Sequence, residues 1–316
     1  MLSGYFATAH AEKAMRKSKF AEREIALYTL KKYLRFLPYC AIGCIIKYTG
    51  TFFFNHDFSV ISSVQFWSKA PFELFLLRDT GITTEELLGP YWYLSSFLIV
   101  LPIFLFLIVC FERIFKYYLV WLLPLFIYGY MIQTFGTIVE TTWWITNLRA
   151  FAGLLLGASL YYLSSFLQKF SFSMAFRYIL SIFEIGLFVF VLTSTMVESW
   201  SWSPMDIFFI SLLYLSLVLS FSSATCTAHF HNRIFDYLGK LSFIIYCLHP
   251  AVIMVFYHYL QPGLLKSVSS PQRQSVTVSI LTIFLSVITL PFVEKILPHL
   301  IQGIKRHCFV TPKTNS

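Results

Sequence analysis

The chain has 316 residues, of which 57% are hydrophobic and only 12% are charged, and its formal net charge is +9 at pH 7. Soluble domains carry about 25% charged residues, so a chain with half that charge could not cover its surface in water. The apolar residues fall in long uninterrupted runs, and backbone amides in hydrocarbon must be satisfied within their own segment. The composition therefore excludes a soluble domain and predicts an all-α, polytopic integral membrane helical bundle.

The N-terminal stretch is basic and favours helix. Residues 5–35 contain neither Gly nor Pro, and Lys and Arg recur throughout them. No apolar core of a cleavable signal peptide is visible there. We interpret residues 1–35 as a basic cytoplasmic arm.

Eight apolar runs follow, each about 17–21 residues long, which is the length that a bilayer needs. The longest link, Asn55–Tyr91, contains an acidic piece, and we expect a short interfacial helix in it. We predict a transmembrane domain over residues 36–295 and a cytoplasmic tail over 296–316. The predicted spans are Phe36–Phe54, Trp92–Phe111, Tyr118–Phe135, Arg149–Leu167, Tyr178–Val197, Met205–Ser222, Leu241–Leu260 and Ser275–Val293.

The distribution of Lys and Arg predicts the orientation of the chain. With the N-terminal stretch inside, the inner segments hold 18 of the 24 basic residues, the outer segments hold five, and one lies within a span. Cytoplasmic loops carry an excess of basic residues, so both termini are predicted to be cytoplasmic. The positive charge then serves to orient the chain, and we expect no nucleic-acid partner.

Five short motifs occur in one order across about 250 residues. Together they resemble the acyltransferase-3 family of membrane-bound O-acyltransferases. The motifs are Leu2-Ser3-Gly4-Tyr5-Phe6; Lys31-Lys32-Tyr33-Leu34-Arg35 with Pro38; Tyr91-Trp92-Tyr93-Leu94-Ser95; Leu148-Arg149-Ala150-Phe151 with Leu156-Gly157; and Leu238-Gly239-Lys240-Leu241-Ser242 with Tyr246 and His249.

The resemblance also implies a departure from the family. Its members usually have ten spanning helices, and the first carries an Arg followed about ten residues later by a His, the proposed catalytic base. The motifs here begin at the end of the second helix, so we expect eight spans and no counterpart of that pair. His10 follows the Ser-Gly motif and cannot replace that base. An enzyme would require the two missing helices to be restored, and a pseudoenzyme remains the alternative.

The resemblance implies that an acyl-CoA, with acetyl-CoA as our expectation, is the donor substrate and that no cofactor is bound. Lys32 and Arg35 lie one helical turn apart, directly before the first span. Arg suits phosphate through its planar fork and Lys as a point charge, so these two residues are candidates for binding the acyl donor. An equally weighted alternative is that they only keep the arm on the inner side.

His249 is a weak candidate for the proton-handling group. Ser242, Tyr246 and His249 are spaced to share one face of a helix. Pro250 has no N–H, which frees a carbonyl near Tyr246 to accept another hydrogen bond. An ionisable group at membrane depth is a functional hypothesis by default. Because the family's base lies elsewhere, we favour a pocket-lining role for His249 and assign no catalytic residue.

For the acceptor we predict a pocket near the outer helix ends that includes Trp92 and Arg149, with Ser242 and Tyr246 on the later helix. An aromatic belt explains the Trp equally well, whereas a positive charge at an outer end is less easily explained. Lys47 and Glu184 lie inside predicted spans, and a buried ion pair is the simplest expectation for them. No metal-ligand or nucleotide-binding motif is present.

The resemblance implies a multi-pass cell-membrane protein that transfers an acyl group from acyl-CoA to a hydroxyl of a cell-envelope polysaccharide, exopolysaccharide or lipid-linked sugar. Its predicted partners are the lipid bilayer, the acyl-CoA and that acceptor. One alternative is a small-molecule transporter or flippase, which would show substrate flux without acyl transfer. The other is a non-catalytic membrane scaffold, which would bind the donor without forming product.

Overall fold

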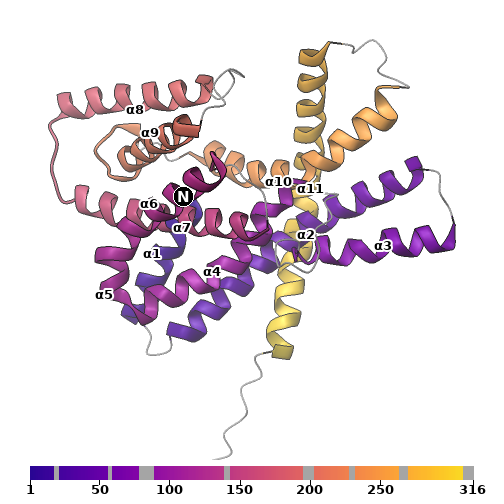
Figure 1. Ribbon diagram of the computed structural model, residues 1–316, viewed down its shortest axis with the longest axis horizontal. Coiled ribbons are helices and arrows are strands. Elements are labelled where there is room, and N and C mark those ends of the chain that lie inside the picture. Colours follow the sequence, from indigo (N-terminus) through magenta and orange to yellow (C-terminus); the bar gives the residue numbers. More distant parts are fainter. Residues whose placement is uncertain are drawn as a thin grey trace, which may run out of the picture. The chain divides into compact units, whose positions relative to one another are not determined.

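The computed structural model describes residues 1–17, 21–55, 59–77, 89–138, 143–194, 203–227, 232–262 and 270–308, and this part of the chain contains no strand (Figure 1). The predicted fold class is therefore confirmed. The helices are α1 (Leu2–Lys17), α2 (Ala21–Asn55), α3 (Val60–Leu74), α4 (Trp92–Cys110), α5 (Glu112–Ile114), α6 (Val120–Phe135), α7 (Trp143–Leu167), α8 (Met174–Ser194), α9 (Ser203–Phe221), α10 (Arg233–Val255) and α11 (Pro271–Cys308). Three shorter segments are the 3₁₀ turn η2 (Gly89–Tyr91) and the π-helical segments η3 (Phe115–Leu119) and η6 (Phe256–Leu260).

Each of the eight predicted spans overlaps a helix, and the last three residues of the fifth, 195–197, lie outside the described residues. Seven helical stretches in the described residues are long and apolar enough to cross a membrane, and the eighth prediction corresponds to the shorter apolar stretch Asp206–Phe221 of α9. Several helices begin before the predicted spans: α7 starts at Trp143, and α10 starts at Arg233. Hydropathy marks only the part of a helix that suits hydrocarbon, and the hydrogen-bond ladder continues into the interface.

The chain forms two compact units. Unit 1 comprises residues 1–29 and 96–231, and unit 2 comprises residues 30–95 and 232–316. Helix α2 continues without interruption past residue 35, and α11 extends to Cys308. The functional division into residues 1–35, 36–295 and 296–316 stays a prediction.

In unit 1, α1 packs against α7 with close contact between their backbones. A Cβ atom on Gly157 would collide with the carbonyl oxygen of Met1, and one on Gly4 would collide with the carbonyl of Leu154. Ala7 and Ala11 are fully buried on α1. Small residues that let backbones approach are characteristic of helix pairs in membranes. The first part of the predicted basic arm is thus packed against a candidate spanning helix.

The rest of unit 1 is built on α7, which also contacts α6 and α9, while α8 packs against α9. Helix α6 ends at Gly136, whose φ of 70° gives the left-handed cap that glycine adopts most readily. The side chain of Glu12 on α1 accepts a hydrogen bond from the Tyr162 hydroxyl at 3.0 Å, which adds a polar contact to the α1–α7 pair.

Unit 2 contains α3, α10, α11 and the larger part of α2. Helix α3 lies in the link between the first two spans, and Ser59 caps its N-terminus by accepting from the amide of Ser62 at 3.2 Å. The rings of Phe66 and Trp67 on α3 pack against Tyr48 of α2, with centroids 5.2 and 5.9 Å away. Most of the acidic piece in this link, residues 78–88, lies outside the described residues. Helix α10 packs along α11.

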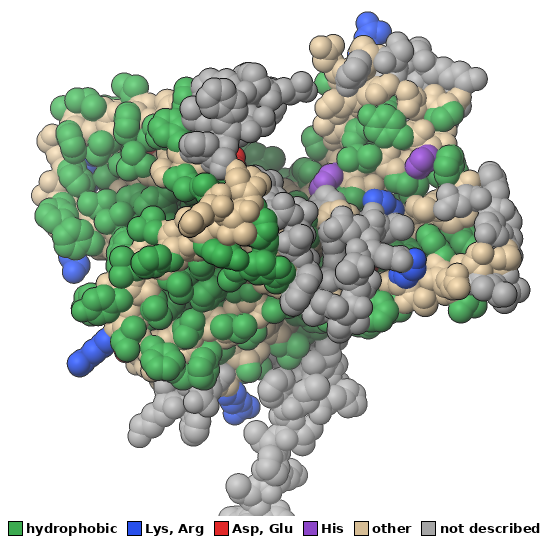
Figure 2. All heavy atoms as spheres, viewed as in Figure 1, with side chains coloured by type: hydrophobic (Ala, Val, Ile, Leu, Met, Phe, Trp, Pro, Cys, Tyr) green, Lys and Arg blue, Asp and Glu red, His purple; other side chains and the backbone are tan. Residues whose placement is uncertain are grey.

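Apolar side chains cover much of the described surface that faces the viewer in Figure 2, and Lys and Arg side chains are few. On α8, for example, Ile179 and Ile182 are 62% and 73% exposed. Monomeric soluble proteins do not expose apolar patches of this extent, whereas hydrocarbon solvates them. The surface therefore agrees with a multi-pass membrane protein.

Candidate functional site

The site is built on a proline in the middle of α10. Pro250 lies inside this helix, and its missing N–H leaves the carbonyl of Tyr246 without its usual partner four residues later. The imidazole of His249 occupies that position, with Nδ1 2.8 Å from the Tyr246 carbonyl oxygen. The prediction that Pro250 frees this carbonyl for another hydrogen bond is confirmed.

This contact selects the tautomer of the neutral His249 ring. A carbonyl oxygen can only accept, so Nδ1 must be the protonated nitrogen that donates to it. In the neutral imidazole, Nε2 then carries the free lone pair and can accept a proton or a hydrogen bond. The Tyr246 ring lies beside the imidazole, with centroids 5.9 Å apart.

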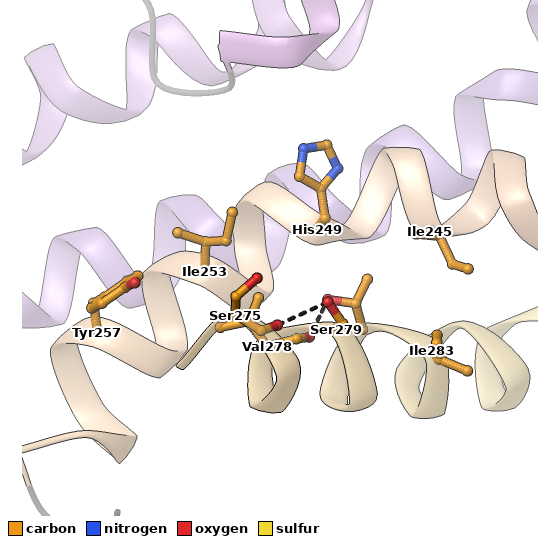
Figure 3. A pocket seen from close by; sticks show the side chains of 9 residues that line it. Ile245, His249, Ile253, Tyr257, Ser275, Val278, Ser279 and Ile283 are labelled. Carbon is orange, nitrogen blue, oxygen red and sulfur yellow. Dashed lines mark hydrogen bonds between the residues drawn. The ribbon is translucent and has the colours of Figure 1, made fainter. Parts of the chain in front are cut away.

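His249 lines a cavity of about 500 Å³ between α10 and α11 (Figure 3). Ile245 and Ile253 contribute from α10, and Tyr257 contributes from the π-helical segment η6. In the view of Figure 3 the imidazole projects from α10 away from the labelled serines of α11. The remaining lining residues come from α11: Ser275, Val278, Ser279, Thr282 and Ile283.

Hydroxyl side chains line one face of α11, at alternating spacings of four and three residues. Their protons are directed to carbonyls of the same helix: Ser279 donates to the oxygen of Ser275 at 2.8 Å, and Thr282 donates to that of Val278 at 2.7 Å. Deeper along this face, Ser286 and Thr289 are buried. The part of this face that lines the cavity, Ser275 to Thr282, therefore gives it a wall of hydroxyl oxygens that retain acceptor lone pairs.

The backbone of α10 beside His249 is held by Tyr91. The single proton of the Tyr91 hydroxyl is shared between the carbonyl oxygen of Cys247 at 2.8 Å and that of Cys40, on α2, at 3.3 Å. Burial raises the pKa of the Tyr91 phenol, so the group keeps the proton that it donates. Gly43 makes room for the contact, because a Cβ there would lie 2.6 Å from the Cys247 oxygen and would collide with the Tyr91 hydroxyl.

The predicted donor residues lie on α2. Lys32 is half-buried and Arg35 is exposed, one turn apart on the helix. Phe36 follows Arg35 and packs against Phe243 of α10, with ring centroids 4.7 Å apart. Helix α10 therefore contacts α2 beside the basic turn, the helical turn that carries Lys32 and Arg35. The contact is at Phe243, six residues before His249, and six residues correspond to a rise of about 9 Å along a helix.

A model of the acyltransferase domain matches residues 1–293. The chain belongs to the acyltransferase-3 family. It is therefore a membrane acyltransferase in the general sense of that family, and the resemblance seen in the five sequence motifs is confirmed. No curated protein and no solved structure matches the chain.

Three of the four predicted acceptor-pocket residues of this acyltransferase-3 protein lie in unit 2, and Arg149 lies in unit 1. Trp92 is the first residue of α4, and Ser242 on α10 donates to the carbonyl of Gly239 at 2.9 Å. Arg149 on α7 donates to the carbonyl of Ile138 at 3.4 Å. The described lining of the α10–α11 cavity does not include Trp92, Ser242 or Tyr246. Their role as a pocket stays a prediction.

Lys47 and Glu184, the two charged residues predicted to lie inside spans, have different partners in the structure. Both carboxylate oxygens of Glu184, on α8, accept hydrogen bonds from hydroxyls, one from Ser220 and one from Thr227 at 2.5 Å. Lys47 instead interacts electrostatically with Glu73, on α3. Over the described part of the acyltransferase-3 chain, no group of three or more His, Cys, Asp or Glu side chains is placed to hold a metal ion.

Sequence reasoning did not identify Tyr91 and Gly43 as residues that position α10. Tyr91 is 156 positions from Cys247, so no local pattern joins them. The one feature of the sequence that could have indicated Tyr91 is that it is the first residue of the Tyr-Trp-Tyr-Leu-Ser motif. In this acyltransferase-3 chain Tyr91 contributes a buried donor, whereas the sequence pointed to the neighbouring Trp92 as an aromatic residue near an outer helix end.

Proposed function

We propose that this protein is a membrane O-acyltransferase that transfers an acyl group, in our expectation acetyl, from acyl-CoA to a hydroxyl of a cell-envelope polysaccharide, exopolysaccharide or lipid-linked sugar. The observation that carries the proposal is the His249 imidazole, which lines the α10–α11 cavity with its Nδ1 tied to the Tyr246 carbonyl. Family membership supports the reaction class.

In the proposed reaction, Nε2 of His249 takes the proton of the acceptor hydroxyl as its oxygen attacks the thioester carbonyl. The carbon–sulfur bond breaks, and the CoA thiolate leaves and takes up the proton from the imidazolium. The products are an O-acyl ester and free CoA. A positioned general base of this kind contributes about 10²–10⁴-fold to a rate.

The donor would bind through its phosphates at Lys32 and Arg35 on α2. The contact of Phe36 with Phe243 supports this proposal, since it brings the basic turn to the same helix that carries His249. The pantetheine arm of CoA would follow α10 toward the cavity. Trp92, Ser242 and Tyr246 are the proposed acceptor contacts of unit 2, and the role of Arg149 toward the acceptor stays a prediction. The cell membrane as the location and the cytoplasmic placement of both termini are part of the proposal.

The test follows radiolabelled acetyl-CoA in detergent-opened membranes that contain the full chain. We expect label in the polysaccharide or the lipid-linked sugar fraction, and we expect mild alkali to release it, as it releases an O-ester. Replacing His249 by Asn keeps an N–H donor for the Tyr246 carbonyl but removes the basic nitrogen. Transfer should therefore fall about 10²-fold or more.

His258→Asn is the matched control. His258 lies on η6 and packs against Phe54, with ring centroids 4.0 Å apart, and is outside the cavity lining. This variant should transfer label at the wild-type rate. Equal transfer by His249→Asn would remove His249 from the mechanism. Donor binding without product would identify a scaffold, and solute flux without acyl transfer would identify a transporter, and either would overturn the proposed function.

A further inference from the structure

Unit 1 contains a separate cavity of about 340 Å³ between α6, α7 and α9. Ligand pockets have volumes of about 300–1,000 Å³, so the space is sufficient for one ligand. Helices α6 and α7 are candidate spans, and α9 is the shorter apolar helix. The lining residues are Val120, Trp121, Pro124, Leu125, Tyr128, Gly129, Leu156, Ser159, Ile207, Ile210, Ser211 and Tyr214.

The lining carries no Asp, Glu, Lys, Arg or His. It therefore offers nothing to balance the charge of a phosphate, a carboxylate or an ammonium group, and burying such a group there would be costly. In this respect the lining differs from that of the unit 2 cavity, which includes the imidazole of His249.

Four of the polar side chains in the lining direct their protons to other protein atoms. Ser159 donates to the carbonyl of Leu156 at 2.9 Å, so the contact of 2.9 Å between Ser159 and Tyr214 must use the proton of Tyr214. Ser211 donates to the carbonyl of Ile207 at 2.8 Å, and the indole of Trp121 donates to that of Lys116 at 3.1 Å. These four side chains have no proton left for a ligand, and most of the other lining residues are apolar, so the cavity favours a largely apolar ligand.

We infer that this cavity binds a fatty acyl chain of a bilayer phospholipid. A hydrocarbon chain gains from the apolar walls and loses no hydrogen bond on entering. Phospholipid surrounds spanning helices at high concentration, which makes it the natural source of such a chain. The site is independent of the acyl transfer proposed for unit 2.

Gly129 gives a way to fill the cavity without straining the protein. A Cβ added at Gly129 meets no atom within 4 Å, so the side chain of Gly129→Phe can enter the space. Gly186→Phe is the matched control, because Gly186 is equally open and lies on α8, outside the lining. Both variants exchange a helical glycine for the same aromatic side chain.

The experiment uses the full chain in vesicles that contain phosphatidylethanolamine with a photoreactive diazirine in its acyl chain, followed by peptide mapping. In the wild type, label should concentrate on the α6, α7 and α9 peptides that line the cavity. Gly129→Phe should reduce that label about tenfold, because excluding about two methylene groups already corresponds to this factor. Gly186→Phe should leave it unchanged.

Three results would overturn the inference. One is undiminished label in Gly129→Phe. The second, which needs only the wild type, is equal labelling of the cavity and of the exposed residues Leu122 and Phe126 of α6, since that pattern would show general lipid contact. The third is label displaced by palmitoyl-CoA but not by excess unlabelled phospholipid, which would assign the cavity to an acyl donor.

Discussion

The two cavities lie among similar apolar helices but present different chemistry. In unit 1, the side-chain protons of Ser159, Ser211 and Tyr214 are used within the protein, and the lining carries no charge. In unit 2, the lining includes an imidazole whose Nδ1 is tied to the Tyr246 carbonyl. The contact of His249 with that carbonyl depends on Pro250, which has no N–H to occupy the carbonyl four residues earlier. Pro124 also lies inside a helix that lines the unit 1 cavity, so the two linings differ in the imidazole and not in the presence of a proline.

The largest effect is expected from filling glycine positions in the two units. Gly43→Leu should destabilise the protein by about 1–3 kcal/mol, the usual cost of overpacking, because its side chain would meet Tyr91 and the Cys247 carbonyl. Gly129→Leu in unit 1 meets open space, and its melting temperature should equal or exceed that of the wild type. Thermal unfolding of both variants in detergent measures the difference. If Gly43→Leu unfolds at the wild-type temperature, Tyr91 and Gly43 do not hold α10 as described.

A smaller effect is expected from restoring the missing amide in α10. Pro250→Ala supplies an N–H that competes with His249 for the Tyr246 carbonyl, so the imidazole loses its fixed orientation. Acyl transfer should fall about tenfold, the equivalent of one hydrogen bond of about 1.4 kcal/mol. The helix itself should become more stable, since Ala is the better helix former.

Pro102→Ala provides the control for that experiment. Pro102 lies inside α4, so its replacement also restores a helical amide, and no part of the proposed site depends on it. Both variants should melt at or above the wild-type temperature, and only Pro250→Ala should lose acyl transfer. Unchanged transfer in Pro250→Ala would show that the freed carbonyl does not matter for the reaction.

Local features of this fold could be predicted from the sequence. The apolar runs identify the seven helices of the described residues that are long and apolar enough to cross a membrane, and the shorter apolar stretch Asp206–Phe221, because a membrane helix needs a continuous stretch of apolar residues. The His249–Tyr246 contact was also predictable, since the partners lie three residues apart and Pro250 defines the missing bond. In both cases the information lies within one helix.

Features that depend on contacts between distant segments could not be predicted. Tyr91 joins carbonyls 51 and 156 positions away, and neither cavity has a sequence signature. The ion pair expected for Lys47 and Glu184 was chosen because both are charges in spans, but the hydroxyls of Ser220 and Thr227 satisfy the carboxylate. Serine and threonine are common in these helices, so sequence alone does not show which of them approach a buried acid.

The central claim is that the Tyr246 carbonyl holds the neutral His249 imidazole in the Nδ1–H tautomer, which leaves the lone pair on Nε2. The most direct test is ¹⁵N solid-state NMR of the full chain in bilayers, labelled at histidine, with His249→Asn used to assign the signal. For the neutral ring we predict that the His249 signal shows a protonated Nδ1 and an unprotonated Nε2. A neutral ring with its proton on Nε2 would contradict the account, because Nε2 could then not take the proton of an acceptor hydroxyl.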